Sequence, residues 1–330
     1  MQTSPPRGHF TDLDGMRGVL AVIVMLHHIG LNSLIAKITY GLIPIGRWGL
    51  CVDFFFILSG FVLYFSLERV RPSYRSYFVK RVRRLAPAFL ISTVAVLLAT
   101  WDTPRTWVVL LANFAMVQSP LAVQSINFPA WSIPFELFLP ALILPVIGAL
   151  AAAETRTVFA IAVSLAVAAA VTAVIFASGI DPVAVRAFFG LSLGMVLGRI
   201  RQLLPLGSDR PVLVLSLFLV AILVMAMAAK FPLLAALFPP VSAVCIFFGT
   251  QTRTFLSSAP FQAIGRWSYS IYLLHIPMLL IVVKTIGTVD GNATLKAFVA
   301  VATIAAAAAM FRFVERPLMQ GSASRAQTAP

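Results

Sequence analysis

The segment that decides the fold is residues 11–30, TDLDGMRGVLAVIVMLHHIG. After Arg17 the chain becomes apolar, and two adjacent histidines, His27 and His28, follow within the apolar stretch. An apolar run of this kind predicts a helix that crosses a membrane, here over residues 17–36. Ionisable side chains inside such a helix are costly, so they are candidates for function. We therefore expect an integral membrane protein with chemistry inside its first span.

The spacing of the charged and titratable residues in this helix narrows the choice. Eleven residues separate Arg17 from His28, which corresponds to about 1100° of helix rotation and leaves the two side chains about 20° apart. The rise between them is about 16 Å, so one lies at the membrane surface and the other near the bilayer centre. His27 lies roughly 80° off this stripe. His28 is therefore the better candidate for a functional histidine.

The composition extends this interpretation to the whole chain. Of the 330 residues 60% are hydrophobic and 11% are charged, whereas soluble domains average about 25% charged residues. Long apolar runs are typical of helices, since the strands of a membrane barrel alternate. Cys51 and Cys245 lie in apolar surroundings, so we expect buried hydrophobes and no metal site. The net charge is +14, but the basic residues lie between the apolar runs, which argues against a nucleic-acid partner.

The apolar runs predict an all-α integral membrane protein with a bundle of about ten transmembrane helices. A short apolar stretch at 107–118, between Pro104 and Pro120, is expected to be re-entrant or interfacial; an eleventh span is the alternative. The expected spans are 17–36, 47–67, 85–101, 131–150, 157–178, 183–200, 211–229, 232–250, 266–286 and 293–313.

The distribution of lysine and arginine predicts the orientation. With both termini in the cytoplasm, most basic residues fall on the inner side, as the positive-inside rule requires. An eleventh span would send many arginines outward, which counts against it. We expect one membrane domain over residues 1–318 and a disordered tail over 319–330. The first apolar run is a poor match to a cleaved signal peptide, so it is expected to be retained.

Two acidic residues stand out because they lie inside expected spans. Asp53 and Gly60 are seven residues apart on one helix face, and Ser132 and Glu136 are four apart on another. Buried acids in membranes usually face a cavity or the bundle interior, so both are candidates for chemistry. The alternative is that each acid pairs with a buried arginine or histidine and fixes helix register.

The densest basic cluster is RVRPSYRSYFVKRVRRLAP, residues 69–87. One interpretation is binding of anionic lipid together with control of topology. The other is a site for a phosphate-rich cofactor, because arginine binds phosphate through two parallel hydrogen bonds. Arg81 and Arg84 are three residues apart and could converge on one anion. His275, before Pro277 in a later span, is more commonly a hydrogen-bonded packing group than a catalyst.

Five motifs in order resemble those of the acyltransferase-3 family of bacterial membrane O-acyltransferases. The resemblance runs from LDGMRG at 13–18 to FVERP at 313–317. Where the fourth motif usually reads W-S-L-S-V-E-E, this chain has WSIPFE followed by Leu137, so Pro134 and Leu137 depart from it. The matching residues are Arg17 and His28; Asp53, Phe55, Phe56, Ser59, Gly60 and Phe61; Arg81, Arg84, Leu85 and Pro87; Trp131, Ser132 and Glu136; and Ser268 to Pro277.

The resemblance implies transfer of an acyl group, often acetyl, from cytoplasmic acyl-CoA to a hydroxyl of a sugar or other acceptor. It also implies that Arg17 and His28 are required, and that the protein is multi-pass in the bacterial inner (plasma) membrane. The implied partners are membrane lipids, acyl-CoA and a carbohydrate or lipid-linked sugar, with no metal. Substrate-binding candidates are Ser59, Trp131, Ser132, Tyr269 and His275.

These residues suggest a mechanism. His28 would act as a general base on the acceptor hydroxyl, because the ordinary pKa of histidine lies near neutral pH. Asp53 or Glu136 would orient the imidazole and stabilise its charged form. The phosphates of coenzyme A would be bound by Arg17, Arg81 and Arg84. A transporter that uses the same buried groups as a proton or substrate path is the main alternative, and a lipid-binding scaffold is a third.

Overall fold

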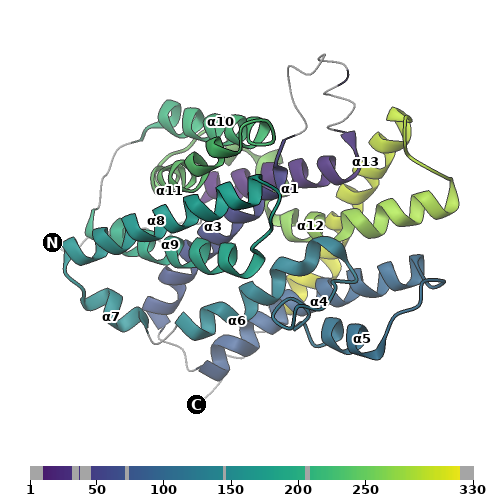
Figure 1. Cartoon of the computed structure of the whole chain (residues 1–330), viewed down its shortest axis with the longest axis horizontal. Coiled ribbons are helices and arrows are strands. Elements are labelled where there is room, and N and C mark those ends of the chain that lie inside the picture. The colour runs from purple at the N-terminus through teal and green to yellow at the C-terminus, as the bar shows by residue number, and fades with distance from the viewer. Residues whose placement is uncertain are drawn as a thin grey trace. The chain divides into compact units, whose positions relative to one another are not determined.

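The computed structural model describes residues 10–31, 37, 46–70, 74–143, 146–204 and 209–319, and within them the chain is helical with no strand (Figure 1). The chain divides into two compact units. Unit 1 comprises Met1–Val19, Gly46–Arg71 and Leu142–Gly265, and unit 2 comprises Leu20–Ile45, Pro72–Ala141 and Arg266–Pro330. Two helices, α1 (Thr11–His28) and α12 (Ala259–Thr285), contribute residues to both units.

Unit 1 is organised around the packing of two helices, α3 (Cys51–Val70) and α9 (Val183–Leu203), which approach closely because glycines face the partner backbone. A Cβ atom on Gly60 would overlap the carbonyl of Leu191, and one on Gly194 would overlap the carbonyl of Ile57. Small residues at such positions are the usual device for close helix approach in membranes. The further elements of unit 1 are η1 (Trp48–Leu50), α7 (Val146–Ala152), α8 (Thr155–Ala177), α10 (Pro211–Met227), η3 (Pro232–Leu237), α11 (Phe238–Gly249) and η4 (Phe255–Ser257).

The beginning of α1 is fastened to the beginning of α12 within unit 1. Gly18 and Gly265 lie so close that a Cβ on Gly18 would overlap the backbone at Gly265. The carboxylate of Asp12 accepts a hydrogen bond from the amide of Thr254 at 2.9 Å, just before α12. The glycines of the LDGMRG segment therefore serve helix packing.

Unit 2 joins its helices through buried polar side chains. The amide nitrogen of Asn127 donates to the Leu273 carbonyl at 2.8 Å and to the Ser92 hydroxyl at 3.0 Å. The Tyr272 hydroxyl donates to the Pro129 carbonyl, so two bonds hold the segment before α6 against α12. The further elements of unit 2 are α4 (Tyr74–Ala99), α5 (Trp107–Phe114), η2 (Phe128–Ser132), most of α6 (Ile133–Ile143), α13 (Ala293–Met310) and the π-helix η5 (Phe311–Glu315).

The described residues contain seven helices that are long and apolar enough to cross a membrane. The predicted span at 131–150 is two helices, α6 and α7, which would count together as an eighth. Pro134 and Pro140 both lie within α6, and the two helices are separated at residues 144–145, which lie outside the described residues and where the sequence has Pro145. Pro211–Met227 is apolar but shorter, and α1 stops before the predicted end at residue 36, which lies outside the described residues. Ten spans with both termini inside therefore stay a prediction.

The expected short segment at 107–118 is confirmed as too short to cross a membrane. Its helix, α5, has eight residues, and a helix of that length spans only about 12 Å. The eleventh-span alternative is therefore wrong for this segment. Residues 320–330, nearly all of the predicted tail, lie outside the described residues.

Candidate functional site

Two histidines that are distant in sequence meet in unit 2. His28 is the last residue of α1 and His275 lies in the middle of α12. Nδ1 of His28 is 2.7 Å from Nε2 of His275, and the rings are nearly parallel, at 9°, with centroids 4.9 Å apart. His275 is fully buried, whereas His28 is half-buried. The pair thus has one inner member and one outer member.

The backbone determines which nitrogen of each ring carries the proton. Nδ1 of His275 lies 3.1 Å from the carbonyl of Ile271, one helical turn earlier. A carbonyl only accepts, so this Nδ1 carries the hydrogen, and Nε2 of a neutral His275 must accept. Nδ1 of His28 is then the donor between the rings, which leaves a lone pair on its Nε2. In the described part of the chain no residue hydrogen-bonds to that Nε2.

Two residues of the predicted substrate group, Ser132 and His275, are linked through Tyr272, whose ring centroid is 6.2 Å from that of His275. The hydroxyls of Ser132 and Tyr272 lie 3.1 Å apart, and both are buried. Trp131 is half-buried immediately before Ser132. The ring of Phe128 meets the ring of His28 edge-on, with centroids 5.8 Å apart. Ser132 and His275 are therefore parts of one polar cluster in unit 2.

A second group of polar side chains gathers around Tyr269, two turns before His275 on α12. The Tyr269 hydroxyl donates to the carbonyl of Leu85 on α4 at 2.7 Å. Four charged side chains lie near it, namely Arg81, Arg84, Glu136 and Glu315. Two of the three arginines predicted to bind phosphate and one of the two predicted catalytic acids are thus near one phenol.

Arg81 contacts Glu136 through the backbone. A terminal nitrogen of Arg81 donates to the main-chain carbonyl of Glu136 at 2.8 Å, which ties α4 to α6. Arg84, one turn further along α4, is exposed. The two arginines therefore differ in burial: Arg81 is half-buried and bonded to the backbone of α6, whereas Arg84 is exposed.

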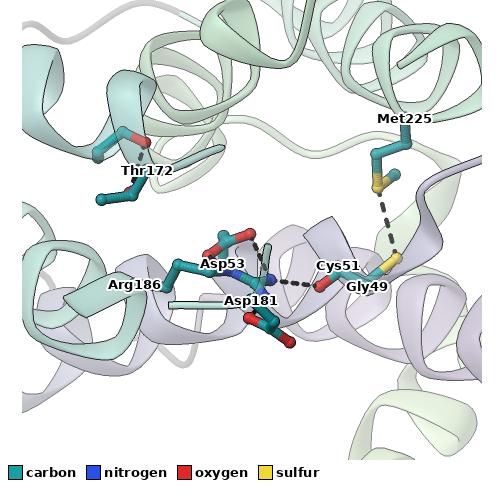
Figure 2. A network of polar contacts seen from close by, with 8 residues as sticks. Gly49, Cys51, Asp53, Thr172, Asp181, Arg186 and Met225 are labelled. Carbon is teal, nitrogen blue, oxygen red and sulfur yellow. Dashed lines mark hydrogen bonds and ion pairs between the residues drawn. The ribbon is translucent and has the colours of Figure 1, made fainter. Parts of the chain in front are cut away.

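Asp53 lies in unit 1 and pairs with a buried arginine (Figure 2). Arg186 donates to both carboxylate oxygens of Asp53, at 3.0 and 2.8 Å, and to Asp181 at 2.7 Å. The same guanidinium donates to the carbonyl of Gly49 at 2.9 Å and lies 3.8 Å from the ring centroid of Phe176. This is the pairing with a buried arginine that the sequence left open as the alternative to chemistry.

Arg17 and Ser59 also belong to unit 1. Arg17 donates to the carbonyl of Gly265 at 2.9 Å and forms an ion pair with Asp14 at 3.0 Å. Ser59 lies half-buried on α3. These contacts give Arg17 a part in the packing of α1 on α12, whatever it does toward a ligand.

Three residues of these clusters were not among the predicted site residues. Tyr272 lies within the motif that contains His275, and Glu315 lies within FVERP, so their positions in the motifs were a usable signal. Glu315 is buried and accepts a hydrogen bond from the hydroxyl of Ser270. Nothing in the sequence marked Arg186 as a partner of Asp53, because it is 133 residues from Asp53 and lies outside all five motifs.

Comparison with known families agrees with the motifs. The family model of the acyltransferase domain, acyltransferase-3, matches residues 10–312. The chain belongs to the acyltransferase-3 family. No curated protein and no solved structure is significantly similar to it. The match includes parts of both units, so the histidine pair, Tyr269 and the Asp53–Arg186 pair lie within the acyltransferase-3 domain, whereas Glu315 lies three residues beyond the match.

Proposed function

We propose that this protein transfers an acyl group, acetyl in the simplest case, from cytoplasmic acyl-CoA to a hydroxyl of a glycan or glycan-like acceptor at the bacterial inner membrane. Membership of the acyltransferase-3 family supports acyl transfer to hydroxyl acceptors. The observation that carries the mechanism is the contact of Nδ1 of His28 with Nε2 of His275. It leaves the other nitrogen of His28 as a general base.

The reaction uses His28 as a proton carrier. Its Nε2 takes the proton of the acceptor hydroxyl as the oxygen attacks the thioester carbonyl. The carbon–sulfur bond then breaks, and the protonated ring returns the proton to the sulfur of coenzyme A. The imidazole is neutral again at the end, so the cycle needs no further group.

His275 acts as a positioning residue in this mechanism. Its own Nδ1 is engaged by Ile271, so its Nε2 is available as an acceptor for His28. That hydrogen bond holds His28 in the basic tautomer and strengthens when His28 becomes charged, which is the task of the acid in a serine hydrolase triad. The same task was expected of Asp53 or Glu136. Because Arg186 engages both oxygens of Asp53, we favour Glu136 as the acid near the reaction.

The donor's phosphates are bound by arginines. Arg84 is exposed on α4, one turn from Arg81, and both lie near Tyr269. Arginine suits phosphate because its planar group donates two parallel hydrogen bonds. Arg17, which forms an ion pair with Asp14 in unit 1, stays a predicted phosphate-binding residue.

The general-base assignment is tested with two neighbouring histidines. His28→Gln removes the base, and we expect release of coenzyme A from acetyl-CoA in the presence of acceptor-containing membranes to fall about 100-fold or more. His27→Gln is the matched control, because His27 is also half-buried and adjacent. Full activity in a folded His28→Gln protein would sink the base assignment.

The reaction class and the acceptor are tested together. Glycans from a deletion strain, compared by mass spectrometry with those of the parent, should lack one acyl substituent, which would return when the gene is restored. Purified protein should also be stabilised thermally by acetyl-CoA. A transporter would show neither result, because it has no use for the thioester.

A further inference from the structure

A cavity of about 490 Å³ lies in unit 2 between α12 and the end of α13 with η5. Three arginines line it: Arg266 from α12, and Arg312 and Arg316 from the last turns of the chain's described part. Trp267 and Ala308 supply apolar walls. The cavity is separate in sequence from the basic segment at 69–87, and no step of the proposed reaction uses it.

The positive charge in this cavity has no counterpart within the described chain. All three arginines are exposed, and none of them forms an ion pair with a described residue. The acid nearest in sequence is Glu315, which is buried and accepts a hydrogen bond from Ser270. The described residues after Glu315, residues 316–319, include no Asp or Glu. Three like charges around one cavity favour a bound anion.

Glu315 lies between Arg312 and Arg316 in the sequence but is not among the residues that line the cavity. Phe311–Glu315 forms a π-helix, a form that occurs mostly as single turns inside α-helices and is frequent at functional sites. Within it Glu315 is directed to Ser270, whereas Arg312 and Arg316 line the cavity. Glu315 therefore forms no ion pair with Arg312 or Arg316.

The wall of the cavity indicates which kind of anion binds. α13 and its extension belong to the candidate span Ala293–Met319, of which only 17% of the apolar window is buried within the chain, the smallest share among the seven spans. A helix so exposed contacts lipid, and its end carries the small residues Ala308 and Ala309 beside the arginines. An acyl chain can lie along such a face while its headgroup reaches the charges.

We propose that Arg266, Arg312 and Arg316 bind the phosphate headgroup of an anionic phospholipid, with its acyl chain against the end of α13. Basic pockets between membrane helices on the cytoplasmic side bind such headgroups, and the predicted orientation puts all three arginines on that side. Lipid access along α13 favours this ligand over a soluble phosphate compound. The site is independent of the proposed acyl transfer.

Lipid retention tests the proposal directly. The full-length protein, purified in a mild detergent, is titrated with dioleoyl-phosphatidylglycerol or dioleoyl-phosphatidylcholine, and bound lipids are counted by native mass spectrometry. We expect one tightly held phosphatidylglycerol and no comparable phosphatidylcholine. Arg312→Gln/Arg316→Gln should weaken its binding roughly 25-fold, since each basic residue near an anionic lipid contributes a factor of about five.

The matched control removes the same charge elsewhere. Arg156→Gln/Arg253→Gln changes two exposed arginines on the same predicted side, and it should leave the tightly held phosphatidylglycerol in place. Equal loss in both double variants, or no loss in either, overturns the proposal. A parallel titration with coenzyme A tests the other source of phosphate. If Arg312→Gln/Arg316→Gln weakens coenzyme A binding and leaves lipid retention unchanged, the proposal is also overturned. Each of these results is independent of whether acyl transfer occurs.

Discussion

Arg186 binds both carboxylate oxygens of Asp53 in the interior of unit 1, and only 1% of its side chain is exposed. Asp181 is the second acid on the same guanidinium, but its side chain is 42% exposed. Asp53 is thus the partner that compensates the buried part of the charge. The pair joins α3 to α9, the two helices that glycines bring together.

Removing one member of this pair should therefore be more harmful than removing both. Asp53→Asn leaves a buried guanidinium with a partly solvated partner, and we expect a loss of about 3 kcal/mol in stability. Asp53→Leu/Arg186→Met should recover most of that loss, because apolar replacements of a buried pair are often neutral. Thermal unfolding in one fixed detergent measures both.

The double variant also decides what Asp53 does. If it folds and retains acyl transfer, the pair is structural, as its geometry indicates. A stable double variant that loses transfer would instead restore Asp53 to the reaction, the role expected from the sequence alone.

The hydrogen-bond chain from Ile271 through His275 to His28 predicts a difference between two substitutions of His275. His275→Phe removes the acceptor, so His28 can place its proton on Nε2 and lose its basic tautomer; we expect kcat to fall about 100-fold. His275→Gln retains an acceptor oxygen near the position of Nε2 and should recover at least tenfold of that loss. KM for acetyl-CoA should change little in either variant.

A purely structural role for His275 would give another pattern. Both variants would then lose activity in proportion to their loss of folded protein, with no recovery by glutamine. Measuring kcat on protein selected as folded by gel filtration separates these outcomes.

The sequence located the helices because apolar runs of membrane length leave few alternatives. It misplaced their ends where helical hydrogen bonding continues beyond the apolar part. The third predicted span begins at residue 85, but α4 begins at Tyr74 and includes the basic residues before it. Likewise α12 begins at Ala259, ahead of the predicted 266. Hydropathy shows only which part of a helix is apolar enough to lie in lipid. The helix itself ends where its backbone hydrogen bonds stop.

The candidate site was predictable residue by residue but not in its pairings. His28 and His275 each stood out as ionisable groups in apolar spans, yet 247 residues separate them, and helical periodicity carries no information across separate helices. For Asp53 the sequence indicated burial and an unknown partner. Arg186 gave no signal because an arginine near a predicted span end also fits a position at the membrane surface.

Close packing of α3 on α9 predicts opposite effects of the same substitution at two glycines. Gly194→Ala adds a methyl group that would overlap the Ile57 carbonyl, so we expect a loss of about 1–3 kcal/mol from overpacking. Gly148→Ala on α7 meets no atom within 4 Å and should be neutral or stabilising by up to about 1 kcal/mol, since alanine favours helix. Melting temperatures compare them; equal shifts would contradict the close approach.

The arginines of α4 predict a selective defect in donor binding. Arg84→Gln removes a charged donor that we propose pairs with a phosphate of coenzyme A, and KM for acetyl-CoA should rise about tenfold or more, the usual weight of one charge-assisted hydrogen bond. The acceptor's KM should be unchanged.

Arg83→Gln is the control, because Arg83 is also exposed but points about 100° away from Arg84 around the helix. Arg81→Gln is a poorer probe, since it also breaks the bond to the Glu136 carbonyl. If Arg83→Gln raises KM as much as Arg84→Gln does, the effect is general electrostatic attraction by the basic segment, and Arg84 makes no specific phosphate contact.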